Sequence, residues 1–175
     1  MKENTKNTLK TLCVQAVMIA LFVVLDMLSL KMGNIKITFG GLPIILCAIL
    51  YGPVSGMSVG LLGSFIGQLL SYGLSATTVL WILPAGVRGL TMGLLFLAFK
   101  KKESVPVLGA EIVATSLLVT VLNTLVGYLD SLIIGYPYAL ALAESLFRLA
   151  SSVITAVAYT AVVPILLKAV RKVVK

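Results

Sequence analysis

The chain has 175 residues, of which 59% are hydrophobic and only 11% are charged. Soluble globular domains are about 45–50% apolar and about 25% charged, so this chain has too few polar side chains to cover a water-exposed surface. The formal net charge of +8 does not indicate nucleic-acid binding, because the charges gather at the two ends and in one central run between apolar stretches. The composition predicts one integral membrane domain over residues 1–175.

The apolar stretches predict membrane helices, because each span needs roughly 20 mainly apolar residues and the stretches lack the alternation of barrel strands. The first stretch follows Lys2, Lys6 and Lys10 and is too long for the apolar core of a signal peptide, so we expect a retained helix. The second, GLPIILCAILYGP at 41–53, is short for a full span. The predicted helices are at about 8–29, 41–52, 54–72, 79–99, 106–129 and 138–168.

The basic residues predict the orientation of this bundle. Lys and Arg mark the cytoplasmic side of membrane proteins, and here they gather at the N-terminus, at 100–102 and at the C-terminus. Six helices place these three clusters on one side, whereas the outer loops at about 29–40, 73–78 and 130–137 contain only Lys31 and Lys36. We therefore expect an all-α bundle of six transmembrane helices with both termini in the cytoplasm.

Small residues four positions apart predict close contacts between helices. Gly56 and Gly60 form such a pair on the third predicted helix, and Gly89 and Gly93 on the fourth, and we expect both pairs to be packing positions. On the first helix Ala16 and Ala20 form a flat patch. This patch has two interpretations that the sequence leaves equal: packing within the chain, or docking of a separate membrane subunit.

Charged side chains inside a span cost roughly 2.5–3.5 kcal/mol and mark functional sites by default. The predicted topology places Arg88 about 14 Å from the outer end of its helix, at 1.5 Å per residue. Other polar groups and nearby aromatic rings reach the same outer half, which predicts a ligand pocket open to the outside. Its candidate residues are Asp26, Phe39, Gln68, Trp81, Arg88, Asn123, Tyr128, Glu144 and Arg148. Glu111 is excluded, because we expect it near the cytoplasmic end, within reach of water or Lys100–Lys102.

The charged candidates have a structural interpretation as well as a functional one. Glu144 and Arg148 are spaced i, i+4 in the favourable order for an ion pair on one helix. Asp26 and Arg88 could pair across the bundle. If neither arginine is neutralised, the pocket is positive, and the planar guanidinium suits a carboxylate. The ligand is then a small anion with an aromatic or apolar body.

Several function classes are excluded by what the chain lacks. It has no phosphate-binding loop of the GxxxxGK[ST] type, no catalytic motif of the HExxH or GxSxG type, and no His at all. Cys13 and Cys47 have no metal-ligand spacing, so no metal site or cofactor is predicted. No inverted repeat is evident at half-length. We expect a binding subunit and not an enzyme; the alternatives are a stand-alone carrier or channel and a subunit with a purely structural role.

The chain resembles the substrate-binding S components of energy-coupling factor (ECF) transporters, which take up vitamins in bacteria. Ala16-x-x-x-Ala20 is similar to the family's docking motif for the coupling subunit. The stretch ITFGGLPIILCAILYGPVSGMSVGLLGSFIGQLL at 37–70 is similar to the family's second and third helices. Its FGxxP and GPxxGxxxG phrases, with LNT at 122–124, are closest to the folate-type branch.

This resemblance implies a multi-pass protein of the bacterial cell membrane that binds a vitamin in its outer half, under a lid formed by the first outer loop. It also implies docking, through Ala16 and Ala20, on a transmembrane coupling subunit that is driven by two cytoplasmic ATPases. Folate is the first candidate ligand and pantothenate the second, with riboflavin and biotin behind them. The ligand-binding residues rest on their depth and chemistry, because no family motif was matched to them position by position.

Overall fold

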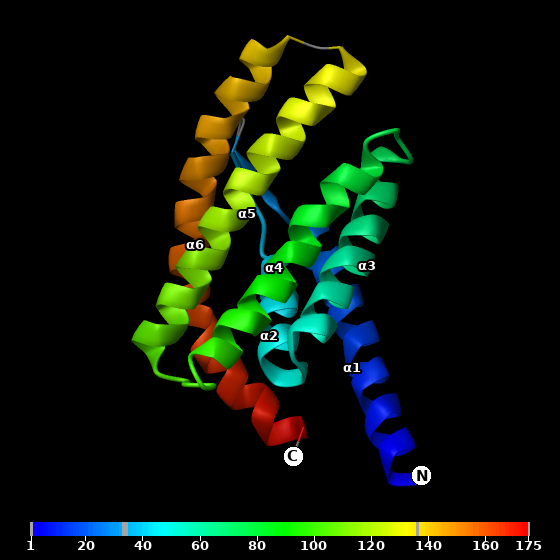
Figure 1. The fold of residues 1–175 in the computed structure, drawn as a ribbon, viewed down its shortest axis with the longest axis vertical. Coiled ribbons are helices and arrows are strands. Elements are labelled where there is room, and N and C mark those ends of the chain that lie inside the picture. The colour runs from blue at the N-terminus through cyan, green and yellow to red at the C-terminus, as the bar shows by residue number, and fades with distance from the viewer. Residues whose placement is uncertain (1, 33–34, 136, 175) are drawn as a thin grey trace.

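The computed structural model describes the backbone of residues 2–32, 35–135 and 137–174, and the side chains of 8–29, 38–135, 137 and 145–172. The described part of the chain is a helical bundle with one short hairpin (Figure 1). The helices are α1 (Lys2–Met27), α2 (Gly41–Tyr51), α3 (Pro53–Tyr72), α4 (Thr78–Ala98), α5 (Val105–Ile134) and α6 (Tyr138–Val174). The strands β1 (Leu30–Met32) and β2 (Ile35–Ile37) pair antiparallel, with Lys31 opposite Lys36.

The predicted helices are present in the predicted order, and α2 is as short as the sequence predicts, whereas α1, α5 and α6 each extend beyond a predicted end. Five helices contain a stretch long and apolar enough to cross a membrane, whereas α2 has only 11 residues. At 1.5 Å per residue it is about 16 Å long, against a hydrocarbon core of about 30 Å. The prediction of an outer loop at 130–137 is mostly wrong, because α5 continues to Ile134. The C-cap residue Gly135 then adopts the left-handed conformation.

The short α2 is enclosed by the other helices. Its residues from Gly41 to Ile49 are all buried, and it contacts α1, α3, α4 and α6. The main core forms around it, where Ile45 packs with Met92, Ile112 and Tyr159, each at most 1% exposed. An 11-residue helix is stable here because its neighbours cover every face of it.

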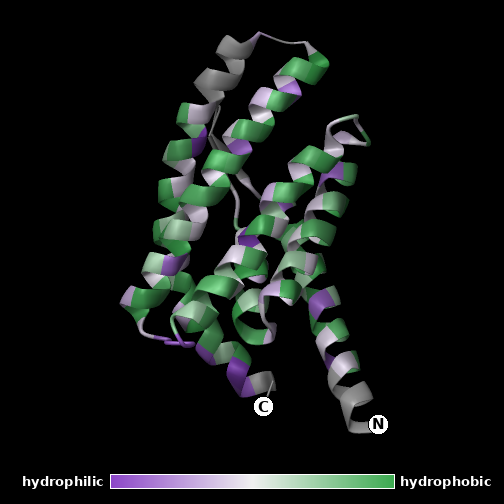
Figure 2. Cartoon of the chain, in the orientation of Figure 1, coloured by the Kyte–Doolittle hydropathy of each residue, from purple (hydrophilic) through white to green (hydrophobic). Residues whose placement is uncertain are grey.

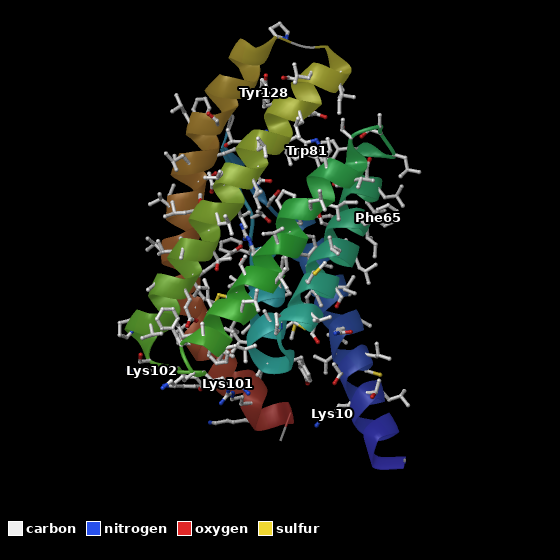
Figure 3. The ribbon with its side chains drawn as sticks, viewed as in Figure 1. Lys10, Phe65, Trp81, Lys101, Lys102 and Tyr128 are labelled. Carbon is white, nitrogen blue, oxygen red and sulfur yellow. The ribbon has the colours of Figure 1, made fainter. Side chains whose placement is uncertain are left out.

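Both chain ends lie at the same end of the bundle (Figure 1). Lys10, Lys101 and Lys102 gather there, and Trp81 lies toward the opposite end (Figure 3). Most of the ribbon is coloured as apolar; hydrophilic residues occur together at the α4–α5 turn and toward the end of α6, and singly along the helices (Figure 2). The position of these lysines at the same end as both chain ends agrees with the even number of membrane crossings inferred from the charges. That this end faces the cytoplasm remains a prediction. The side chains of Lys31 and Lys36 lie outside the described residues.

Glycines bring α3 and α4 into backbone contact, as the small-residue spacing predicts. A Cβ atom on Gly60 would collide with the carbonyl group of Ala85, and one on Gly89 with the backbone of Gly56. A Cβ atom on Gly93 would lie within 2.8 Å of three atoms of Pro53. These contacts confirm the packing interpretation, and they fix the rotation of α4 about its axis, which decides where Arg88 points.

Replacing Gly89 by Val should destabilise the bundle by about 1–3 kcal/mol, because the new side chain has to push two backbones apart. The measurement is the thermal unfolding midpoint of the purified protein in detergent. Gly67→Ala is the matched control, since a Cβ atom there would meet its nearest neighbours at an ordinary 3.8 Å. Equal midpoints for the two variants would contradict the close α3–α4 contact.

Candidate functional site

A cavity of about 750 Å³ opens between the helices in the half of the bundle away from the chain ends. Residues from all six helices line it, together with Thr38, which precedes α2, and with Ser75 and Thr77, which precede α4. It contains the charged side chains Asp26, Arg88, Asp130 and Arg148, the polar side chains Gln68 and Asn123, and the ring of Trp81. Its volume is in the range of small-molecule sites, about 300–1,000 Å³.

Six of the nine predicted pocket residues therefore line one cavity, two do not, and one lies outside the described side chains. Phe39 packs against the core around α2, and the ring of Tyr128 is 41% exposed on the outside of α5; neither is among the residues that line the cavity. The side chain of Glu144 lies outside the described residues, so its pairing with Arg148 remains a prediction.

Arg88 reaches the floor of the cavity, where α2 begins. A methyl group on Gly41 would overlap the Arg88 guanidinium and would lie 2.7 Å from the Tyr159 hydroxyl oxygen. Gly41 is the first residue of α2, whose first turn contains no acidic residue. The N-terminus of a helix carries a partial positive charge, and Arg88 adds a full one. The floor thus combines two positive groups, an arrangement that favours an anion.

The alternative pairing of Arg88 with Asp26 is not formed among the described side chains. The Asp26 carboxylate instead accepts a hydrogen bond of 2.9 Å from the Thr38 hydroxyl. The same Thr38 oxygen accepts one of 3.2 Å from the Gly40 N–H. Asp26 therefore holds the end of the hairpin segment against α1, and no carboxylate of the described residues lies within 4.0 Å of the Arg88 guanidinium nitrogens.

Tyr159 is a site residue that the sequence interpretation missed. Its hydroxyl accepts a hydrogen bond of 3.1 Å from the Gly41 N–H and donates one of 2.8 Å to the Thr38 carbonyl oxygen. The side chain is 1% exposed. A buried tyrosine hydroxyl in an apolar helix needs a hydrogen-bond partner, so the presence of a tyrosine within this apolar stretch was the signal that the sequence offered for Tyr159. Only the fold shows that the partner is the N-terminus of α2.

Arg148 lies on the opposite wall, among groups from two other helices. Its Nη1 donates a hydrogen bond of 2.8 Å to the Asn123 carbonyl oxygen of α5. Its guanidinium carbon lies 5.0 Å from the ring centroid of Trp81 on α4, within the range of a cation–π contact. The absence of a side chain on Gly127 makes room for it, because a Cβ atom there would lie 2.8 Å from Nη1. Arg148 thus positions Trp81 and faces the cavity.

Hydroxyl groups make up much of the remaining wall, and the sequence interpretation did not select them. Several donate their proton to a carbonyl of their own helix, as Thr120 does to Ser116 at 2.8 Å, so they present oxygen lone pairs to a ligand. Ser and Thr are common in membrane helices for packing reasons, so the sequence offers no signal that separates these from others. The hydroxyl residues are Thr38, Ser64, Ser75, Thr77, Thr120, Ser151, Ser152 and Thr155.

The expectation that Glu111 reaches water is wrong. The side chain is 1% exposed, and neither carboxylate oxygen has a hydrogen-bond partner among the described residues. Glu111 lies one turn from Leu108 and from Thr115, whose hydroxyl contacts the Met92 sulfur at 3.9 Å. This face of α5 therefore points into the bundle, where the carboxyl group is covered. Glu111 is not among the residues that line the cavity.

Ala16 and Ala20 lie on the exposed side of α1. The same helix packs on α2 and α3 through Met18 and Phe22, which are 7% and 8% exposed. Both alanines are exposed, so the interpretation that they pack against other helices of this chain is not supported. The exposed side of α1 is instead a long apolar surface, which includes Val17 at 58% and Val24 at 51% exposure.

These features define a membrane-embedded binding protein, with one polar cavity inside a multi-pass helical bundle. The family model of the ECF transporter substrate-specific component matches residues 10–173, and the chain belongs to this family. It is therefore a transport subunit and not an enzyme. A comparison with curated proteins found no significant match.

Two solved structures share the fold at low sequence identity. One is described as the S component of a bacterial ECF transporter; it is 17% identical, has a TM-score of 0.67, and the match covers 96% of this chain and 99% of that one. The other is ThiT from Listeria monocytogenes, 20% identical with a TM-score of 0.72, covering 96% of this chain and 98% of that one. Identities this low support the fold and not a shared ligand.

Removing the Tyr159 hydroxyl should destabilise the protein by about 1–3 kcal/mol, because Tyr159→Phe leaves a buried N–H and a buried carbonyl without partners. The measurement is the thermal midpoint, with amide exchange at Gly41 as a local readout. Tyr51→Phe is the matched control, since the Tyr51 hydroxyl oxygen is buried and has no hydrogen-bond partner among the described residues. We expect that control to be neutral or stabilising, and the opposite ranking would contradict the assigned hydrogen bonds.

Proposed function

We propose that this chain is the high-affinity vitamin-binding subunit of an ATP-driven importer in a bacterial cell membrane, and that its vitamin is an anion. The observation that carries the choice of an anion is the cavity floor. There Arg88 lies against the first residue of α2, and no carboxylate of the described residues forms an ion pair with it. A cation would add a third positive charge to this point, whereas a carboxylate would be received by both groups.

The rest of the cavity suits a ligand that also carries hydrogen-bonding groups and a flat or apolar part. Hydroxyl oxygens and Gln68 can receive N–H or O–H groups, and Trp81, supported by Arg148, offers a ring face for stacking. Folate combines a flat pterin ring with carboxylates, and pantothenate combines a carboxylate with hydroxyl and amide groups. We propose folate first and pantothenate second, since the volume of about 750 Å³ admits either.

Arg88→Gln should weaken vitamin binding by at least about tenfold, because hydrogen bonds to charged groups contribute about 1.5–3 kcal/mol. Folate, pantothenate and thiamine, the last a cationic vitamin, are titrated into the purified chain and followed by tryptophan fluorescence or calorimetry. Lys101→Gln, which removes an exposed charge from the α4–α5 turn, is the control. Tight thiamine binding that is unaffected by Arg88→Gln would overturn the proposal of an anion.

We further propose that the exposed side of α1 docks on a transmembrane coupling subunit, which is energised by two cytoplasmic ATPases. Ala16 and Ala20 form the flattest part of this surface, and small residues at i, i+4 allow close approach of a partner helix. The polar cavity does not include either residue, so docking and vitamin binding use separate parts of the chain.

Changing both Ala16 and Ala20 to Trp should abolish co-purification with the coupling subunit and vitamin uptake, because the bulky rings prevent close helix contact. Vitamin binding by the isolated chain should stay unchanged. The matched control changes Val121 and Leu125 to Trp, since they are also spaced i, i+4 and are 66% and 54% exposed on α5. Full uptake by the α1 variant, or ATP-independent flux in liposomes that contain only this chain, would contradict docking.

A further inference from the structure

A second, smaller groove lies at the end of the bundle that holds both chain ends. It has a volume of about 470 Å³ and runs between the start of α5 and the last turns of α6. Its lining residues are Val105, Thr160, Ala161, Pro164, Ile165, Lys168, Ala169 and Lys172. The groove shares no residue with the polar cavity, and α5 and α6 lie on the side of the bundle away from α1 (Figure 1).

The groove is apolar at one end and basic at the other. One side is a stripe of α6 in which Thr160, Pro164, Lys168 and Lys172 recur every four residues, so they lie in line along one face. The part nearer the middle of the bundle is formed by small or branched apolar groups, of which Ile165 is 69% exposed. The two ammonium groups come last, near the chain end, where a membrane would present its polar headgroups.

The two lysines of this groove form no ion pair within the part of the chain that the structure describes. The neighbouring Arg171 forms an ion pair with Glu103 in the α4–α5 turn. Among the described residues, Lys168 and Lys172 have no carboxylate within ion-pair distance. The other described acidic residues do not reach the groove, since Asp26 and Asp130 line the polar cavity and Glu111 is buried in the core.

The start of α5 adds further donors beside these lysines. Its N-cap residue Ser104 makes no side-chain hydrogen bond to the first turn, which contains no acidic residue. The Ser104 side chain therefore does not cap this turn, in which Val105 and Val107 carry N–H groups and Pro106 carries none, and the helix dipole makes this end favourable for an anion. Val105, the first residue of α5, lines the groove, so the dipole and the two lysines act on the same space.

We infer that this groove binds an anionic phospholipid. Lys168, Lys172 and the start of α5 receive the phosphate, and an acyl chain lies along Ala161, Pro164 and Ile165. Basic grooves between membrane helices at headgroup level are the setting in which anionic lipids bind specifically. A lipid matches both halves of the groove, whereas a free phosphate would use only the basic half. The position away from α1 separates the groove from the proposed docking side.

The experiment is native mass spectrometry of the purified full chain in detergent, with phosphatidylglycerol or phosphatidylcholine added at equal concentration. We expect stable adducts with phosphatidylglycerol and few with phosphatidylcholine. Changing both Lys168 and Lys172 to Gln should weaken the first lipid by about thirtyfold, since each basic residue contributes roughly fivefold at an anionic surface. The control changes Lys101 and Lys102 to Gln, which removes the same charge from the exposed turn.

Ala161→Trp provides a second variant that fills the apolar half of the groove and leaves the lysines in place; it should also lower phosphatidylglycerol binding. Equal lipid binding by the two lysine variants would overturn the inference, as would equal binding of both lipids to the unmodified chain. Inorganic phosphate is tested last, as a competitor of the lipid in the same measurement. If phosphate alone displaces the lipid at equal concentration, the ligand is a free anion and the lipid assignment is wrong.

Discussion

The site depends on one crowded junction, where the Arg88 guanidinium and the Tyr159 hydroxyl both reach the backbone of Gly41. Two positive groups, a helix N-terminus and an arginine, lie together in an interior of low dielectric. Asp26 and Asp130 line the same cavity, but no described carboxylate forms an ion pair with the arginine. The Tyr159 hydroxyl holds the entry to α2 in place by satisfying the Gly41 N–H and the Thr38 carbonyl. The floor is therefore rigid and positive before any ligand arrives, which reduces the cost of binding an anion.

The glycine contacts between α3 and α4 make this junction possible. Gly60 and Gly89 let the two backbones touch, so α4 has little freedom to rotate. Arg88 precedes Gly89 and is consequently aimed inward over α2. Without an apolar driving force between helices in lipid, this close backbone contact is the means by which the bundle holds a charge at one depth and in one direction. Packing and chemistry thus use neighbouring residues of the same helix.

The two ends of the bundle carry different kinds of polar groups. The cavity half combines charges of both signs with many hydroxyls, and its charged groups contact other helices, as Arg148 does with Asn123 and Trp81. The end with both chain ends has mostly basic residues on its surface, and of the described acidic side chains only Glu103 compensates them there. This asymmetry agrees with a protein that holds a small ligand in one half and meets headgroups and partner subunits in the other.

Much of the candidate site was predictable, because a charge inside an apolar run is costly and its depth follows from counting residues. Asp26, Gln68, Arg88, Asn123 and Arg148 were selected in this way, and all line the cavity. Tyr128 was selected by the same depth argument but points outward, because depth does not fix the rotation of a helix. Glu111 was excluded for its position near a helix end, and yet it is buried inside the bundle.

The sequence by itself determined the membrane class, the order of the helices, the glycine contacts and the small-residue face of α1, since composition and local spacing encode each of these. Only the tertiary structure decided that the short α2 is enclosed by the other helices, that its N-terminus meets Arg88 and Tyr159, and that Asp26 bonds Thr38 and not the arginine. These contacts join residues up to 121 positions apart in the chain. Such pairings depend on how each helix is rotated against the others, and no local pattern records that rotation.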